Sequence, residues 1–173
     1  MIIAITALVL IVLAFGLVVL RGAPYVPSHA REVKQAFSEL YPLGTKDMVI
    51  DVGSGDGIVL RLAAQRGARA IGYEINPFLV IISRLFSWGS ALVTVELADF
   101  WFKQLPAETT LVYAFTVSRD VDKLADKLQK EANRLGKPLM FIIYGADLKH
   151  RKPLKKHRGH HLYEFAPLQE EKP

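Results

Sequence analysis

Apolar residues follow two alternating patterns along most of the chain. Short apolar runs bounded by Gly, Pro and polar residues predict five strands. These runs cover residues 48–52, 69–75, 91–97, 111–117 and 139–144. Between successive runs, apolar residues recur at helical spacing, for example from 121 to 135, where Gly136 ends the stripe. This alternation is typical of an α/β, Rossmann-like, doubly wound sheet that is mostly parallel.

The two ends of this region depart from the alternation. Near the start, Ser28 is the expected N-cap of a helix whose apolar stripe contains Val33, Phe37 and Leu40. Near the end, no helical stripe precedes the apolar segment 161–166. An antiparallel hairpin therefore suits the C-terminal part better than another strand and helix.

The helix expected from 77 to 88 is apolar almost all round. Asn76 is its N-cap and Pro77 its first residue. Its predicted buried face contains Phe78, Ile81, Ile82, Leu85 and Phe86. Leu79 and Val80 then project elsewhere, either against a neighbouring helix or as a surface that meets a membrane substrate or lipid.

The N-terminal segment carries no charged side chain from Ile2 to Leu20. As a helix it spans about 28 Å, which is close to the hydrocarbon core of a bilayer. A cleaved signal peptide is disfavoured because no Lys or Arg precedes the apolar run, and a core helix is disfavoured because no polar face interrupts it. An uncleaved transmembrane anchor is the favoured interpretation.

We therefore expect residues 1–21 to form a membrane anchor and residues 22–173 to form one domain. The basic residues Arg21, Arg31 and Lys34 follow the apolar segment, and no Lys or Arg precedes it. By the positive-inside tendency, the domain should lie on the cytoplasmic side of the membrane as part of a single-pass protein.

Composition and charge restrict the chemistry further. The chain has no Cys, which excludes a disulfide framework, a thiolate nucleophile and a zinc site built on sulfur. The formal net charge is +5, but a cluster near the C-terminus accounts for it. The cluster consists of Lys149, Arg151, Lys152, Lys155, Lys156 and Arg158. One local patch predicts a solvated hairpin or a contact with anionic lipid, and no nucleic-acid partner is expected.

Four histidines lie in the same part of the chain. They are His150, His157, His160 and His161. Because no carboxylate or thiolate companion accompanies them at ligand spacing, no metal site is expected.

A glycine-rich turn follows the first strand, with the sequence Asp51-Val52-Gly53-Ser54-Gly55-Asp56-Gly57. The dinucleotide fingerprint requires Gly where this chain has Ile58, and Asp56 would repel an anionic pyrophosphate. The Walker pattern also fails, because no Gly-Lys-Ser/Thr follows. Two carboxylates around the turn suit a cationic ligand that carries an ammonium and a sulfonium. The turn therefore predicts S-adenosylmethionine, the alternative being an ordinary tight turn.

Two further acidic residues each follow a strand. Glu74 ends the second strand, where one carboxylate can accept hydrogen bonds from both hydroxyls of a ribose. Asp99 follows the third strand and is placed to accept from an adenine amino group, while Phe100 and Trp101 offer aromatic surfaces to the purine. Because the carboxyl ends of parallel strands meet at one edge, these residues should converge on one ligand.

With these motifs, residues 25–166 resemble the class I, seven-strand S-adenosylmethionine-dependent methyltransferases. A closer resemblance is to the small membrane-associated lysine methyltransferases that modify the ATP synthase c-subunit and the adenine nucleotide translocase in mitochondria, and to their bacterial relatives. It rests on Tyr25-Val26-Pro27-Ser28, Asp51 to Gly57, Gly72-Tyr73-Glu74-Ile75-Asn76-Pro77-Phe78-Leu79-Val80 with Ser83-Arg84, and Asp99-Phe100-Trp101.

The resemblance implies a set of residues that contact the cofactor. They are Tyr25, Ser28, Asp51, Gly53, Ser54, Gly55, Asp56, Gly57, Glu74, Asn76, Asp99, Phe100 and Trp101. Within the set, Tyr25 and Ser28 are expected to close over the methionine end, the alternative being a simple start to the first helix. The chain departs from the family pattern at Phe102, where Lys is usual, and over residues 116–120. Because that stretch borders the acceptor in the family, the resemblance does not carry the acceptor over.

No Asp/Asn-Pro-Pro-Tyr follows the fourth strand, which disfavours a nucleobase acceptor. The expected function is a membrane-anchored protein-lysine N-methyltransferase that acts on a membrane-associated protein. Tyr25 or Asp120 would orient the acceptor amine, but the sequence assigns no catalytic residue. The alternatives are a non-catalytic membrane adaptor that keeps the fold, and a methyltransferase for a lipid head group or small metabolite.

Overall fold

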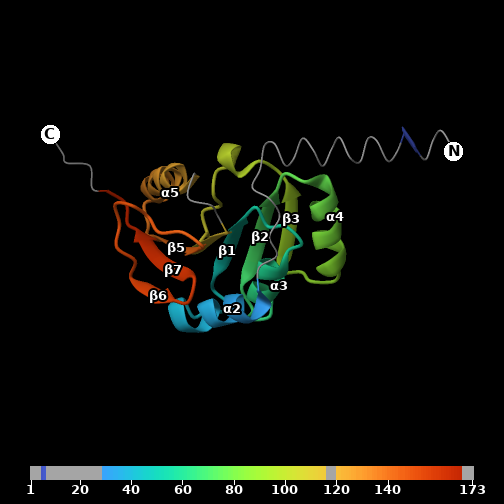
Figure 1. Ribbon diagram of the computed structural model, residues 1–173, viewed down its shortest axis with the longest axis horizontal. Coiled ribbons are helices and arrows are strands. Elements are labelled where there is room, and N and C mark those ends of the chain that lie inside the picture. Colours follow the sequence, from blue (N-terminus) through green and yellow to red (C-terminus); the bar gives the residue numbers. More distant parts are fainter. Residues whose placement is uncertain (1–4, 7–28, 116–119, 169–173) are drawn as a thin grey trace.

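The computed structural model describes residues 5–6, 29–115 and 120–168, and within them the strands form one sheet (Figure 1). The strand order is β3-β2-β1-β4-β5-β7-β6. The strands are β1 (Met48–Val52), β2 (Arg69–Glu74), β3 (Val93–Leu97), β4 (Leu111–Phe115), β5 (Leu139–Tyr144), β6 (Lys155–His157) and β7 (His160–Phe165). β1 to β5 run parallel, whereas β7 is antiparallel to both β5 and β6.

Helices cover both faces of the sheet. They are α2 (Ala30–Gln35), the π-helical turn η1 (Ala36–Leu40), α3 (Ile58–Ala64), α4 (Pro77–Phe86), the 3₁₀ turn η2 (Phe100–Phe102) and α5 (Val121–Leu135). Figure 1 shows α2 and α3 on one side of the sheet, α5 on the other, and α4 flanking β3. One core cluster joins α2, η1 and α3 to the sheet, and a second joins η2 and α5 to its opposite face.

β1 lies between β2 and β4 at the centre of the parallel part. The chain leaves β1 toward β2 and later returns to β4 on the other side, so the order of strands reverses there. Ligands of open α/β sheets bind beyond the carboxyl ends of the strands at such a reversal. The glycine turn after β1 lies at this edge.

The α/β Rossmann-like sheet, its mostly parallel strands and its closing antiparallel hairpin confirm the predicted fold. β1, β5 and α5 have the predicted limits, while β2 is one residue and β3 two residues shorter than predicted. β4 begins at the predicted Leu111, and its predicted last two residues lie outside the described residues. α2 begins after His29, whose side chain makes no capping hydrogen bond, and the predicted cap Ser28 lies outside the described residues.

The predicted membrane anchor lies outside the described residues, apart from the helical Ile5 and Thr6. Within 5–6, 29–115 and 120–168, no helix combines the length and the apolar composition needed to cross a bilayer.

The prediction of which face of α4 points toward the sheet is wrong. Val80, expected to project away from the core, is 2% exposed, whereas Ile81 is 63% and Leu85 62% exposed. The inward face instead presents Val80 and the small side chains of Ser83 and Ser87.

Contacts from two other elements fix this direction. Gly57 approaches so closely that a Cβ there would lie 2.1 Å from the Ser83 Oγ. On the neighbouring side, the Arg84 guanidinium donates two hydrogen bonds, of 3.0 and 2.8 Å, to the carbonyl of Val95 in β3. The larger apolar side chains of α4 consequently face outward.

Candidate functional site

The glycine turn leaves β1 through three residues in the left-handed region. Gly53, Gly55 and Gly57 have φ values of +72°, +53° and +79°, which side chains with a Cβ rarely adopt. The amides of Gly53 and Ser54 donate to the carbonyl of Tyr73 in β2. A Cβ at Gly53 would meet nothing within 4 Å. The backbone thus borders open space at this point.

Asp51 places a buried carboxylate directly beneath the turn. The residue is 3% exposed, and its Oδ2 has no hydrogen-bond partner among the residues that the structure describes. Burial, reinforced by the negative charges of Glu74 and Asp56, raises the pKa of Asp51 well above its usual value. A carboxylate held in this way is an acceptor without a donor, so a cationic donor bound at the turn would stabilise its ionised form.

Glu74 joins the turn to the start of α4. Its Oε2 accepts from the Gly55 amide at 2.9 Å, and its Oε1 accepts from the Asn76 amide at 2.8 Å. A carboxylate has about four lone-pair sites, so each oxygen retains capacity to accept a hydroxyl. The sequence did not predict this link between turn and helix.

Asp56 has local partners. Its Oδ1 accepts from the Ile58 amide at 3.1 Å, and its Oδ2 lies 3.6 Å from the Arg61 guanidinium. Arg61 therefore pairs with the negative charge of Asp56, which the sequence pattern had suggested would face a cationic ligand. Of the two turn carboxylates, Asp51 is the one whose charge lacks a partner in the described chain.

The remaining acceptors after β2 and β3 cap helices. The Asn76 side chain accepts from the Phe78 amide at 3.0 Å, and the Asp99 side chain accepts from the Trp101 amide at 2.9 Å. Phe100 in η2 points its side chain into the core, where its ring centroid lies 6.2 Å from that of Tyr73. Trp101 is partly buried, with the Lys123 ammonium 4.0 Å from its ring centroid.

The structure therefore brings the turn, Glu74 and Asn76 together directly, and it gives Phe100 a role in the core. The cofactor contacts of all these residues stay predictions. Tyr25, Ser28 and residues 116–119 lie outside the described residues, while Asp120 is the N-cap of α5.

An aromatic pair at the same edge was not predicted from the sequence. Phe115 ends β4 and Tyr144 ends β5; they are register partners, and their ring centroids lie 5.3 Å apart. Asp51 pairs with Tyr113, two residues before Phe115, so alternation along the strands puts Asp51, Phe115 and Tyr144 on one face of the sheet.

Tyr144 also connects this edge to α2. Burial first, and then the hydrogen bond that its hydroxyl donates to the Glu32 carboxylate, raise its pKa. An aromatic residue at the end of two adjacent predicted strands was the signal available in the sequence, but only the register shows that the rings meet.

The C-terminal basic cluster is largely engaged within the domain. Lys149 pairs with Asp122 at 2.7 Å and Lys156 with Asp147 at 3.0 Å. The Arg151 guanidinium lies 4.3 Å from the centroid of the Phe165 ring. These contacts favour a solvated hairpin, and the predicted contact with anionic lipid stays a prediction.

Taken together, this edge offers a buried carboxylate whose Oδ2 has no partner among the described residues, a second carboxylate that bridges turn and helix, and open space beside Gly53. These residues fit a cofactor with an ammonium and a ribose: Asp51 is placed for the cation, and Glu74 for the hydroxyls. The aromatic pair lies farther along the edge, toward β5.

Comparison with known proteins agrees with this geometry. A lysine N-methyltransferase of the ATP synthase c-subunit from Xenopus laevis is 34% identical over 111 residues, which cover 62% of this chain and 48% of that protein. A Mus musculus adenine nucleotide translocase lysine N-methyltransferase is 39% identical over 112 residues, which cover 62% of this chain and 48% of that protein. The chain thus spans about half the length of the curated relatives it matches.

Among solved structures, an RNA methyltransferase from Salinibacter ruber in complex with S-adenosyl-L-homocysteine superposes with a TM-score of 0.73. It is 24% identical, and the match covers 85% of this chain and 98% of that chain. No protein-family model matches the sequence. The chain has the fold of class I S-adenosylmethionine-dependent methyltransferases, and the lysine N-methyltransferases of the ATP synthase c-subunit and of adenine nucleotide translocase are its homologues.

Proposed function

We propose that the chain is an S-adenosylmethionine-dependent protein-lysine N-methyltransferase, tethered by its N-terminal segment and acting on a membrane-associated protein. The observation that carries the proposal is the buried carboxylate of Asp51, whose Oδ2 has no partner in the described structure, next to a glycine turn that borders open space at Gly53. The names of the homologues support the reaction and the membrane-protein acceptor. On the same basis, the ATP synthase c-subunit and the adenine nucleotide translocase are the first acceptors to test.

The chain's residues divide the work along the edge of the sheet. Asp51 accepts hydrogen bonds from the ammonium of the bound cofactor, and Glu74 accepts from its ribose hydroxyls. S-adenosylmethionine, when bound, supplies a methyl group on a sulfonium. Positioning of the acceptor then carries most of the catalysis, because an in-line displacement needs mainly alignment and exclusion of water.

A lysine acceptor must lose a proton before it attacks, since its free pKa is about 10.4. The bound cofactor would supply the methyl carbon for the new bond to the acceptor nitrogen, with its sulfur as the leaving group. The rings of Phe115 and Tyr144 suit the aliphatic stem and the cation of such a side chain. The Glu32 carboxylate, next to the Tyr144 hydroxyl, is placed to accept the released proton or to orient the amine.

Cofactor binding is the first test. Titration of S-adenosylmethionine into the full chain in detergent should give binding that Asp51→Asn and Glu74→Gln each weaken by about 10- to 100-fold, as expected for lost hydrogen bonds to charged groups. Glu96→Gln is a matched control, because Glu96 lies on β3 and pairs with Lys103 at 2.7 Å. Undetectable binding by the folded protein would contradict the proposal and favour the non-catalytic adaptor.

The acceptor is tested with a labelled methyl group. The full chain is incubated with labelled cofactor and with proteoliposomes that contain either candidate protein, and peptide mass spectrometry locates the label. We expect label on a lysine of the protein, and about 10- to 100-fold less with Asp51→Asn at a cofactor concentration below the Kd of the original chain. Label on lipid or on a small molecule instead would identify the alternative methyltransferase.

The tether needs its own test. In vesicles with the domain outside, the protein should resist extraction by carbonate through residues 1–21. In cells, a protease should digest the domain only from the cytoplasmic side. Digestion from the opposite side would reverse the proposed orientation.

A further inference from the structure

Among the described residues, exposed large apolar side chains gather on the outward face of α4. Its exposed apolar side chains continue into the turn after the helix, where Trp88 is 86% exposed. The set consists of Ile81, Ile82, Leu85, Phe86 and Trp88. We call this set the α4 apolar face. Contiguous exposed apolar side chains mark interaction surfaces.

We infer that the α4 apolar face inserts into the interfacial region of a lipid bilayer and thereby orients the domain against the membrane. The inference concerns a surface outside the cofactor site, and it rests on the proposed function only for the tether that brings the domain to the bilayer.

The composition of the face is that of an interfacial helix. Isoleucine, leucine and phenylalanine supply the apolar part, and a tryptophan at the end is typical of the level of the lipid head groups. The segment from Ile75 to Val95 contains no acidic residue, and Arg84 is the one basic residue in this segment. Anionic head groups would therefore meet no opposing acid from this segment.

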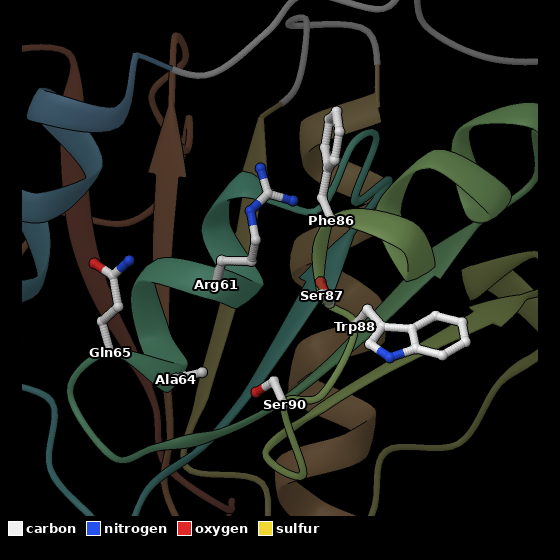
Figure 2. Close-up of a pocket in the computed structure, with 7 residues that line it drawn as sticks. All are labelled: Arg61, Ala64, Gln65, Phe86, Ser87, Trp88 and Ser90. Carbon is white, nitrogen blue, oxygen red and sulfur yellow. The ribbon is translucent and has the colours of Figure 1, made fainter.

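A cleft beside the face adds a cation at its edge. The cleft, of about 290 Å³, lies between α3 and the end of α4 and is lined by Arg61, Gln65, Phe86 and Trp88 among others (Figure 2). The Arg61 guanidinium lies 5.2 Å from the centroid of the Phe86 ring. In Figure 2 these two side chains extend in the same direction, while Trp88 points away from them. A guanidinium next to apolar rings suits a lipid phosphate above acyl chains.

The size of the face favours lipid over a second copy of the chain. The face consists of five side chains on and just after a helix about 15 Å long, whereas a stable protein interface takes about 20–30 residues on each partner. Insertion into a bilayer has no such lower limit, because each apolar side chain that leaves water contributes separately.

The length of the chain before α2 is compatible with this contact. Residues 22–28, between the predicted anchor and α2, have a maximum reach of about 25 Å at roughly 3.5 Å per residue. A linker of this length would keep the domain next to any bilayer that the anchor spans. α2, where the linker attaches, packs on α3, which neighbours α4 through Gly57 and Ser83.

Tryptophan fluorescence of the full chain tests the contact. Trp101→Phe leaves Trp88 as the single tryptophan, and Trp88→Phe leaves Trp101. Each protein is reconstituted into phosphatidylcholine and phosphatidylglycerol vesicles, with or without lipids brominated near the head-group end of the acyl chain. We expect brominated lipid to reduce the emission of Trp88 and to leave that of Trp101 unchanged. Binding should also shift the Trp88 emission to shorter wavelength.

A second pair of variants separates the helix from the tether. In the Trp101→Phe background, Ile81→Ser with Leu85→Ser should abolish the loss of Trp88 emission, while the protein still floats with the vesicles. Leu154→Ser is the matched control, because Leu154 is 56% exposed on another part of the surface. It should leave the quenching unchanged.

Other outcomes would overturn the inference. Emission of Trp88 that acrylamide quenches fully and brominated lipid does not would put the face in water. Protection from both quenchers would mean that protein covers it, and cross-linking would then identify a second copy or another segment of the chain. Neither readout requires methyl transfer, so loss of the proposed activity with intact lipid quenching would leave this inference standing.

Discussion

The two halves of the sheet differ in the kinds of group that they leave without partners or exposed to solvent. The half formed by β4, β5, β7 and β6 contains α5, whose apolar stripe is buried and whose Glu131 accepts from the Leu105 amide and pairs with Arg134. The half formed by β1, β2 and β3 contains the unpaired Asp51 carboxylate and the outward apolar face of α4. A buried polar group without a partner costs stability, whereas contiguous exposed apolar side chains mark a surface that interacts with something else.

The difference indicates a division of labour. In the first half, packing and hydrogen bonds stabilise α5 against the sheet. In the second half, the Asp51 carboxylate and the outward face of α4 are groups to which a cationic cofactor and a bilayer would bind. Substitutions that remove ordinary packing should therefore harm the first half most. Substitutions at these groups of the second half should cost little stability or increase it.

The largest contrast is expected between two leucines. Leu128 on α5 is fully buried, so Leu128→Ala should lower the free energy of unfolding by about 2–5 kcal/mol. Leu85→Ala on α4 should change it by no more than about 0.5 kcal/mol, because that side chain is largely exposed. Urea denaturation in detergent measures both. Equal losses would mean that the outward face of α4 is packed, and the comparison would fail.

His160 lies in the first half and, like Thr109 there, has a buried side-chain atom without a partner among the described residues; its effect should depend on pH. It is buried beside Tyr113, whose hydroxyl lies 3.0 Å from the imidazole Nε2, and its Nδ1 has no partner in the described chain. Burial lowers its pKa from 6.5 to about 4. The unfolded state therefore binds the proton more readily between these values, so the stability contribution is complete above pH 6.5 and is lost as pH falls toward 4.

The measurement is the free energy of unfolding from pH 7 to pH 4 for the original chain and for His160→Gln. Over this range the original chain should lose about 3 kcal/mol more than the variant. Parallel pH profiles would show that the imidazole is not held neutral by burial.

Gly57 tests why α4 lies as it does. A Cβ at this position would combine a positive φ with a clash against the Ser83 hydroxyl, so Gly57→Ala should cost about 1–3 kcal/mol. Adding Ser83→Gly removes the clash but not the backbone strain, and should restore part of the loss. If the second substitution restores nothing, the close approach of Gly57 to Ser83 does not fix the helix.

The sequence predicted the elements of both halves for a common physical reason. Strand and helix periods, the glycine turn and the closing hairpin are local features, and each was recognisable within a short window. The placement of Asp51 and Glu74 at one edge followed from parallel topology alone. No contact between distant residues was needed for these predictions.

The failures arise where a long-range contact decides between local alternatives. α4 is apolar on both sides, so periodicity cannot tell which side faces the sheet; the contacts of Ser83 with Gly57 and of Arg84 with Val95 decide it. The aromatic pair of Phe115 and Tyr144 depends on the register of β4 and β5. The ion pair of Asp56 with Arg61 is local, and its spacing in the sequence was a signal available to find it.

The last prediction concerns the sign of a small change in the free energy of unfolding, caused by Asp51→Asn. Without cofactor, the raised pKa of Asp51 means that the folded state binds its proton more tightly than the unfolded state. The associated stability is present below the unfolded value near 3.8 and is lost as pH rises through the folded value. Asp51→Asn removes this loss, so at pH 8 the variant should be more stable than the original chain by about 1 kcal/mol.

Thermal unfolding without S-adenosylmethionine compares the stability of the two proteins, and unfolding with it measures how much the cofactor stabilises each. At one fixed concentration, the cofactor should raise the melting temperature of the original chain more than that of Asp51→Asn, because a ligand stabilises a protein only to the extent that it binds the folded state. An Asn variant that is less stable than the original chain at pH 8 would mean that the carboxylate already has a partner. Asp51 would then belong with the paired groups of the other half, and the division between the two halves would not hold.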